Sequence, residues 1–208
     1  MQGYPDLSQV TSIITGVPPS NESGFVKALN TTSTSTPLTV FAPVNSAIVR
    51  LANHTVTESL LAATLNYGSL GNTSLREILI ANHIIAGAAL NSTLLADAII
   101  NAPTGYHFPL NISFGITHLT TSIGLNITVA GFVTSNTRLP IPPLIMIQNS
   151  LIIVPNAIIA ANGVVHLISN VIDPFIPATG GFYGPTVEIT RGIHTLFAPL
   201  VKLIANYI

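Results

Sequence analysis

The sequence predicts an α+β fold in which helices come first and strands follow, rather than an alternating α/β fold. Two observations support this prediction. Between Asp6 and about Ala89 the apolar residues recur at helical spacing. Beyond Pro109 the chain is rich in Ile, Val, Leu and Thr, and Pro and Gly interrupt it at short intervals, which is typical of successive strands. A chain of 208 residues is long enough to bury a sizeable core.

The helical half of the chain begins at Asp6. There "DLSQVTSIITG" places four apolar residues on one helical face, and Gly16 ends the helix. The polar spacer "TTSTSTP", Thr31–Pro37, is interpreted as a surface loop, with O-glycosylation as an added hypothesis. Further on, "SLREILIANHII" predicts a helix that leads into an extended segment.

The stretch "LTVFAPVNSAI" predicts a strand that turns into a helix. Thr39–Phe41 form a short β-run, and Pro43 ends its hydrogen-bonding ladder. Asn45 or Ser46 then caps a helix that begins with Ala47. We therefore expect this stretch to set a corner of the fold and to perform no chemistry.

The segment Leu144–Ile172 carries no formal charge over a length that could cross a bilayer. Amides and a proline interrupt it every few residues, and each would need a partner in lipid, so we expect strands and no transmembrane span. Asn162-Gly163 is the strongest hairpin signal in the chain. The expected strands are Leu144–Ile147, Leu151–Val154, Ala157–Ala160 and Val164–Ile168.

Charge is the anomalous part of the composition. Charged residues make up 6% of the chain, with six Lys and Arg against seven Asp and Glu, whereas about 25% is usual. No basic surface is available to attract nucleic acid or anionic lipid, so we exclude nucleic-acid binding.

Glycosylation sequons are frequent. Chance would give roughly three or four in a chain this rich in Asn, Ser and Thr, but seven are present, none with Pro at the middle position. The absence of cysteine excludes a disulfide framework.

The start "MQGYPDLSQV" lacks the basic and apolar segments of a signal peptide, as expected of a mature chain. We predict a secreted N-glycoprotein. The candidate acceptors are Asn21, Asn30, Asn53, Asn72, Asn91, Asn111 and Asn126.

Three motifs in order resemble those of the fasciclin domain family. "LTVFAPVNSAI" is similar to the family's first box, and "NAIIAANGVVHLISNVIDP" is similar to its second. Between them, Asn82-His83 resembles the family's histidine motif, as in animal matrix members, and is a candidate adhesion motif. The residues that match the two boxes, interpreted as structural, are Thr39, Phe41, Ala42, Pro43, Asn45, Asn162, Gly163, Val165 and His166.

The resemblance implies a fasciclin-like wedge-shaped β-sandwich with several helices packed on one side. We expect one such domain at residues 1–176 and an ordered apolar extension at 177–208. The resemblance also implies an extracellular module used for adhesion and matrix assembly. Its partners would be other copies of the chain and cell-surface or matrix glycoproteins and glycans.

Catalytic and metal chemistry find no support in the sequence. No nucleophile elbow or phosphate loop is present, and the histidines show no metal-ligand spacing. One hypothesis gives His83 and His166 a pH-sensitive or adhesive role. We favour the other interpretation, in which both are buried imidazoles that are hydrogen-bonded to the backbone. We expect no enzyme activity, no metal and no cofactor.

The alternative function is a carrier of an apolar small molecule such as a carotenoid. Some fasciclin proteins of algae hold carotenoids, and this chain has few charged residues that would exclude such a ligand.

The C-terminal extension is relevant to the predicted adhesive function. It repeats "TLFAP" at Thr195–Pro199 without the motifs that would make a second domain. We expect it to pack on its own domain or to add a strand to a neighbouring copy and build a filament. The residues assigned to this assembly tail are Tyr183, Val187, Ile189, Ile193, Leu196 and Phe197.

Overall fold

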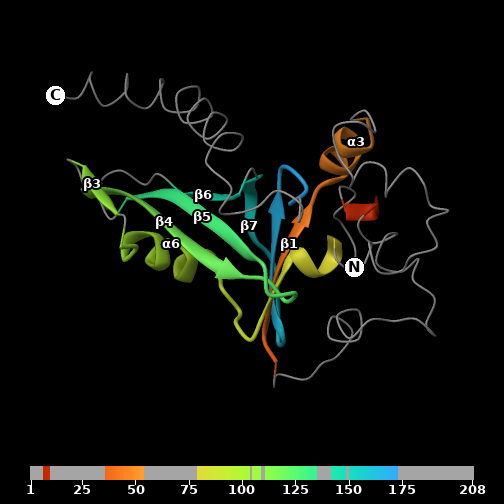
Figure 1. Cartoon of the computed structure of the whole chain (residues 1–208), viewed down its shortest axis with the longest axis horizontal. Coiled ribbons are helices and arrows are strands. Elements are labelled where there is room, and N and C mark those ends of the chain that lie inside the picture. Colours follow the sequence, from red (N-terminus) through yellow and green to blue (C-terminus); the bar gives the residue numbers. More distant parts are fainter. Residues whose placement is uncertain are drawn as a thin grey trace. The chain divides into compact units, whose positions relative to one another are not determined.

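The computed structural model of the chain describes residues 7–9, 36–53, 79–103, 105–108, 111–134, 142–148 and 150–172 (Figure 1). The chain divides into two compact units, Met1–Phe175 and Ile176–Ile208, and all described residues lie in the first. The predicted helix at Asp6–Gly16, apart from residues 7–9, and the assembly tail lie outside the described residues.

The described strands form a single eight-stranded sheet, in the order β2-β1-β8-β7-β6-β5-β4-β3. Pairing is antiparallel throughout except between β1 and β8, which run parallel. Within the described part of the chain, helix α3 at Asn45–Asn53 and helix α6 at Ser92–Ile100 accompany it. The strands are β1 Leu38–Pro43, β2 Ile84–Ala86, β3 Tyr106–Phe108, β4 Ile112–Thr120, β5 Asn126–Thr134, β6 Leu144–Ile147, β7 Ser150–Ala160 and β8 Gly163–Ile168.

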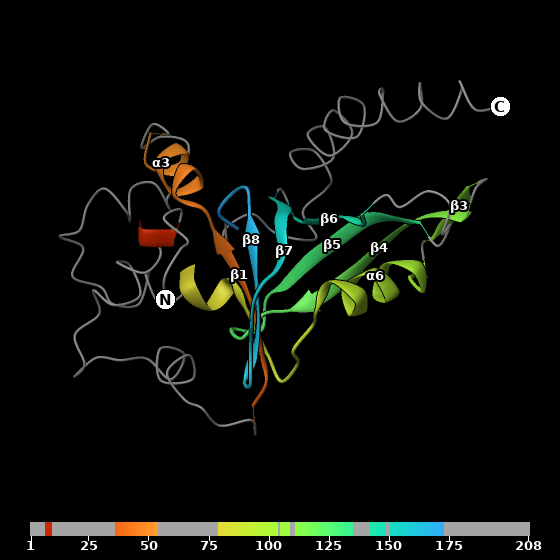
Figure 2. The same ribbon diagram turned by 180° about the vertical axis from the view of Figure 1, so that it is seen from behind.

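One long strand, β7, joins the two halves of this sheet. It pairs with β6 only at its first two residues and with β8 over the rest, with register shifts on both sides of Val154. Such bulges bend a strand and increase its twist. In both ribbon views β1, β7 and β8 stand upright while β4, β5 and β6 run across them (Figures 1 and 2). The described strands therefore belong to one open mixed sheet, where the sequence predicted a sandwich.

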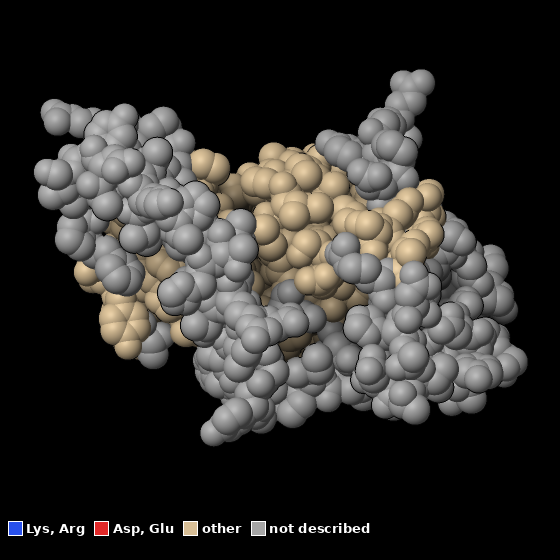
Figure 3. All heavy atoms as spheres, turned by 90° about the horizontal axis from the view of Figure 1, so that it is seen from above, with Lys and Arg blue, Asp and Glu red and all other residues tan. Residues whose placement is uncertain are grey.

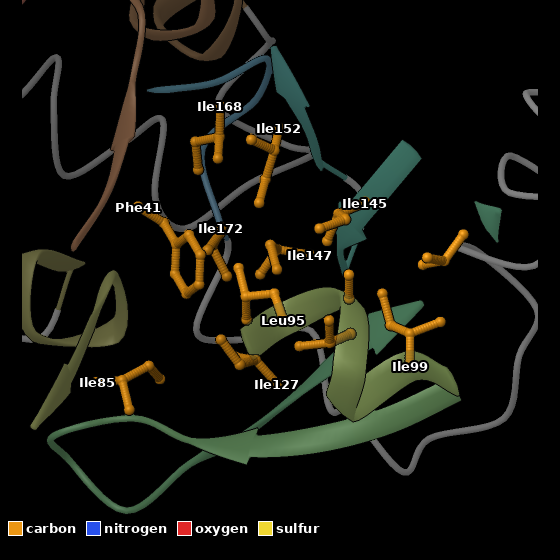
Figure 4. Close-up of a cluster of buried hydrophobic side chains, with 13 residues drawn as sticks. Phe41, Ile85, Leu95, Ile99, Ile127, Ile145, Ile147, Ile152, Ile168 and Ile172 are labelled. Atoms are coloured by element: carbon orange, nitrogen blue, oxygen red, sulfur yellow. The ribbon is translucent and has the colours of Figure 1, made fainter. Parts of the chain in front are cut away.

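The main core fills the angle between the two halves of the sheet (Figure 4). Helix α6 packs against β4 and β5 and contributes Leu95 and Ile99, both fully buried. Close approach of this helix requires glycine on both strands. A Cβ on Gly115 would lie 1.9 Å from the carbonyl oxygen of Ile99, and one on the paired Gly131 would lie 2.8 Å from Ile99 Cδ1.

A second core is formed by other residues of the chain, which belong to β1, to α3 and to the segment after β8. It joins Ala47 and Ile48 of α3 to Ala42 of β1 and Leu167 of β8. Helices α3 and α6 therefore contribute to two different cores.

The local predictions for the second half of the chain are largely confirmed. Strand β6 has the expected bounds, and residues 79–82 are helical and lead into β2. The strands expected on either side of Pro155 are one strand, β7, which accommodates the proline at a bulge. No helix among the described residues is long and apolar enough to span a membrane.

The β7–β8 hairpin is also present, with a turn at residues 161–162 and Gly163 already paired with Ala160. The glycine is required for another reason, because a Cβ there would lie 2.2 Å from the carbonyl oxygen of Leu38 on β1. Gly163 thus permits the close parallel contact of β1 and β8.

Candidate functional site

The parallel pairing of β1 and β8 brings the two sequence boxes side by side. Thr39 lies opposite Val164, and Phe41 lies opposite His166. The rings of Phe41 and His166 stack with centroids 5.7 Å apart and an interplanar angle of 26°. Both side chains are fully buried. The boxes therefore form one structural unit in the interior.

His166 is held by two backbone groups from other parts of the chain. Its Nε2 lies 2.8 Å from the carbonyl oxygen of Leu90, and its Nδ1 accepts a hydrogen bond from the backbone N–H of Asn156 at 3.1 Å. Since Nδ1 accepts, Nε2 carries the proton of a neutral imidazole. Burial lowers the pKa of His166 below 6.5, against the opposing effect of the hydrogen bond to Leu90.

His83 has the same kind of environment with the opposite tautomer. Its Nδ1 lies 2.8 Å from the carbonyl oxygen of Leu79, and its Nε2 accepts from the backbone N–H of Ile172 at 2.9 Å. Nδ1 therefore carries the proton. Burial lowers the pKa of His83 from 6.5 to about 4, with the hydrogen bond to Leu79 acting in the other direction.

Asn82 completes this arrangement. Its Nδ2 donates to the carbonyl oxygen of Ile172 at 3.3 Å, and its buried Oδ1 has no hydrogen-bond partner. Asn82 is 1% exposed and His83 is 5% exposed. The candidate adhesion motif thus lies in the interior and binds the chain's own backbone, which gives no support to direct contact between these two side chains and a partner.

Thr39 ties β1 to the segment after β2. Its hydroxyl donates to the carbonyl oxygen of Ala88 at 2.8 Å and accepts from the backbone N–H of Leu90, also at 2.8 Å. The side chain is fully buried. Because the Leu90 carbonyl accepts from His166, the two boxes converge on this one segment.

Asn45 does not act as the predicted cap. Helix α3 begins at Asn45 itself, and its first hydrogen bonds go from Ala47 and Ile48 to the carbonyl of Val44. The Asn45 side chain instead accepts from the backbone N–H of Gln9 at 3.0 Å and donates to Ser8 Oγ at 2.9 Å. It fixes residues 7–9 against the start of the helix.

Three sequons have described side chains. Asn111 and Asn126 are exposed, and Asn91 is half-buried. The Asn91 Oδ1 caps α6 by accepting from Leu94 N at 2.9 Å, and Asn126 Oδ1 accepts from Thr120 Oγ1 at 3.1 Å. The remaining acceptors, Asn21, Asn30, Asn53 and Asn72, lie outside the part of the chain whose side chains are described.

The described surface is almost free of charge. Asp97, which is exposed, is the one charged residue among the described side chains, and Figure 3 shows a face with neither acidic nor basic side chains among its described atoms. Two apolar side chains are well exposed, Ile159 at 72% and Tyr106 at 64%. No three His, Cys, Asp or Glu side chains within the described ranges come together to hold a metal ion.

Sequence reasoning did not find the partners of the buried histidines. Leu79, Leu90, Asn156 and Ile172 all contribute backbone groups. A backbone amide has no residue signature, so no sequence pattern could have indicated these contacts.

Comparison with known proteins gives a family. No curated protein matches the sequence. A solved structure of a FAS1 domain pair from the insect cell adhesion molecule Fasciclin I is similar, with 16% sequence identity and a TM-score of 0.43. The match covers 91% of this chain and 53% of that one, so the chain spans about half the length of this relative. The model of the Fasciclin domain matches residues 9–174. The chain therefore belongs to the fasciclin domain family, whose members are generally adhesion-related, extracellular or cell-surface proteins and are typically not enzymes.

Proposed function

We propose that this chain is a secreted, N-glycosylated adhesive or structural protein that acts through protein–protein or protein–glycan contacts and assembles through its C-terminal extension. The observation that carries the proposal is the near absence of charge on the described surface, where Asp97 is the one charged residue among the described side chains. This part of the surface has almost no charge with which to steer a charged substrate or polyanion. It suits contacts between neutral surfaces, made by hydroxyl, amide and apolar groups.

Glycans supply the solvation that charged side chains would otherwise give. Asn111, which directly precedes β4, and Asn126, the first residue of β5, are both exposed and so accessible to glycosylation. A net charge of −1 gives little repulsion between copies of the chain. Glycosylation at these positions would keep such a chain in solution while leaving other surfaces open.

Assembly is assigned to the apolar extension at residues 177–208, which carries the strand-like run "TVEIT". A strand donated to the sheet of the next copy is a head-to-tail contact, and such contacts build filaments when they do not close. Light scattering of the secreted chain and of a variant lacking Tyr183–Ile208 tests this step. We expect large particles with the full chain and single chains with the variant, and equal particle sizes would refute it.

The adhesive function itself is tested with beads coated with the secreted protein. We expect coated beads to clump with each other or to bind cell-surface glycoproteins, and uncoated beads to do neither. The alternative function, a carrier of an apolar small molecule, predicts a different result. An organic extract of the purified protein would then contain a stoichiometric coloured or lipid compound, and beads would remain dispersed.

A further inference from the structure

Two side chains, Asn82 and His83, hold both backbone groups of Ile172, beyond the end of β8. We propose that this pair is an acid-sensitive latch, which releases the backbone of Ile172 when His83 gains a proton. The inference goes beyond the proposed function, because it does not require the C-terminal extension to mediate assembly.

The latch depends on one tautomer of His83. Nδ1 donates to the carbonyl oxygen of Leu79 at 2.8 Å, so Nε2 must accept the hydrogen bond from Ile172 N at 2.9 Å. Asn82 Nδ2 donates to the carbonyl oxygen of the same residue at 3.3 Å. A second proton on the imidazole would occupy Nε2. The Nε2–H group and the N–H of Ile172 would then face each other as two donors without an acceptor. Protonation therefore removes the bond to Ile172 and makes the closed position repulsive.

Among the described residues, the surroundings offer the imidazolium no compensating charge. The described elements around His83 are β1, whose Phe41 N–H donates to the His83 carbonyl, the helical residues 79–82, residues 121–122 and residues 169–172. Their described residues include no Asp, Glu, Lys, Arg, Tyr or second histidine. Burial accordingly lowers the pKa of His83 from 6.5 to about 4. The proton is accepted more readily when the latch is open and the imidazole meets water.

Local opening at the latch disturbs less of the fold than opening at the other buried histidine. His166 lies in the middle of β8, which is paired on one side with β1 and on the other with β7. Ile172 lies four residues beyond the last paired residue of β8, and Ser169 and Asn170 are held there by Ser150 and Leu151. Opening at Ile172 therefore exposes the buried side chain of that residue but leaves the pairing of β8 with β1 and β7 intact.

The pH window follows from the direction of the pKa change. Because the pKa in the closed state lies below that of an exposed histidine, the closed latch keeps its full stability above about pH 6.5 and loses it as the pH falls toward 4. Within that window the ratio of open to closed forms rises nearly tenfold per pH unit. Between pH 7.5 and pH 5 the expected increase is about 30-fold.

Hydrogen exchange on the full-length chain tests the proposal. Amide exchange, corrected for the intrinsic pH dependence of the rate, is compared between the peptide that contains Ile172 and a peptide from β8. We expect opening at Ile172 to increase about 30-fold from pH 7.5 to pH 5, with no matching increase in β8. Equal increases in both peptides would show global opening and overturn the latch. So would an Ile172 amide that exchanges freely at pH 7.5.

Two variants separate the latch from a general acid effect. His83→Gln removes the titrating group, so exchange at Ile172 should be fast at both pH values and lose its pH dependence. Asn82→Ala weakens the latch but keeps the histidine, so exchange should be faster at every pH and retain the 30-fold response. If the first variant does not fold, Asn82→Ala decides the matter through the contrast between peptides, because exchange should be faster at Ile172 and unchanged in β8, and equal acceleration in both peptides would refute the proposal. The exposed His118→Gln is the control and should behave as the unmodified chain does, and a persistent response in His83→Gln would refute the proposal.

Discussion

The hydroxyl of Thr39 offers the sharpest test of how the two sequence boxes are joined. Thr39→Val keeps the shape of the side chain and removes two hydrogen bonds of 2.8 Å each, one to Ala88 and one to Leu90. The variant leaves a carbonyl and an N–H without partners near a fully buried position. An unsatisfied buried group costs about 1–3 kcal/mol, so we expect the free energy of unfolding to fall by roughly 2–4 kcal/mol.

The matched substitution is Thr39→Ser, which keeps the hydroxyl and loses one methyl group. Removing a buried methyl costs about 1 kcal/mol, so the serine variant should be clearly more stable than the valine variant. Urea unfolding followed by circular dichroism gives both values at constant m. A valine variant that unfolds with the same free energy as the unmodified chain would refute the contribution of these two hydrogen bonds. A serine variant that is as unstable as the valine variant would refute it as well, because the methyl would then matter more than the hydrogen bonds.

Two further predictions concern α6. Gly115→Ala places a Cβ 1.9 Å from the Ile99 carbonyl oxygen, so the last turn of α6 must move, and thermal unfolding should show a loss of about 1–3 kcal/mol. Thr120→Ala, on the exposed end of the same strand, should cost much less, and equal costs would contradict the packing argument. In protein made without glycans, Asn91→Ala should lose about 1 kcal/mol with its cap, whereas Thr93→Ala abolishes the same sequon and should leave stability unchanged. A loss in both variants would show that the cap is not the cause.

Local patterns in the sequence predicted the elements of this fold better than their arrangement. Alternating apolar residues and turn signals were sufficient for β6, for the β7–β8 hairpin and for the corner after β1. The single sheet was not predictable in this way, because it depends on a parallel pairing between β1 and β8, over a hundred residues apart. The continuity of β7 through Pro155 was missed since proline usually ends a ladder, and here a bulge accommodates it.

Predictions from residue type alone were wrong or incomplete for residues whose role depends on tertiary contacts. Asn45 has the chemistry of a helix cap, but its side chain binds Ser8 and Gln9. Gly163 belongs to a hairpin signal, but its lack of a side chain is needed for the approach of Leu38. The buried histidines were identified correctly as interior residues bonded to backbone, while their partners could not be named. Those partners are amides and carbonyls, which look alike at every position of a chain.

The salt dependence of bead adhesion tests the central claim most directly, because a contact between uncharged surfaces does not depend on ionic screening. Beads coated with the secreted, glycosylated chain should clump to the same extent in about 50 mM and about 1 M salt. Beads that stay dispersed in both and also bind no cell-surface glycoprotein would contradict the adhesive function. Clumping that disappears at high salt would contradict the assignment of that function to an uncharged surface.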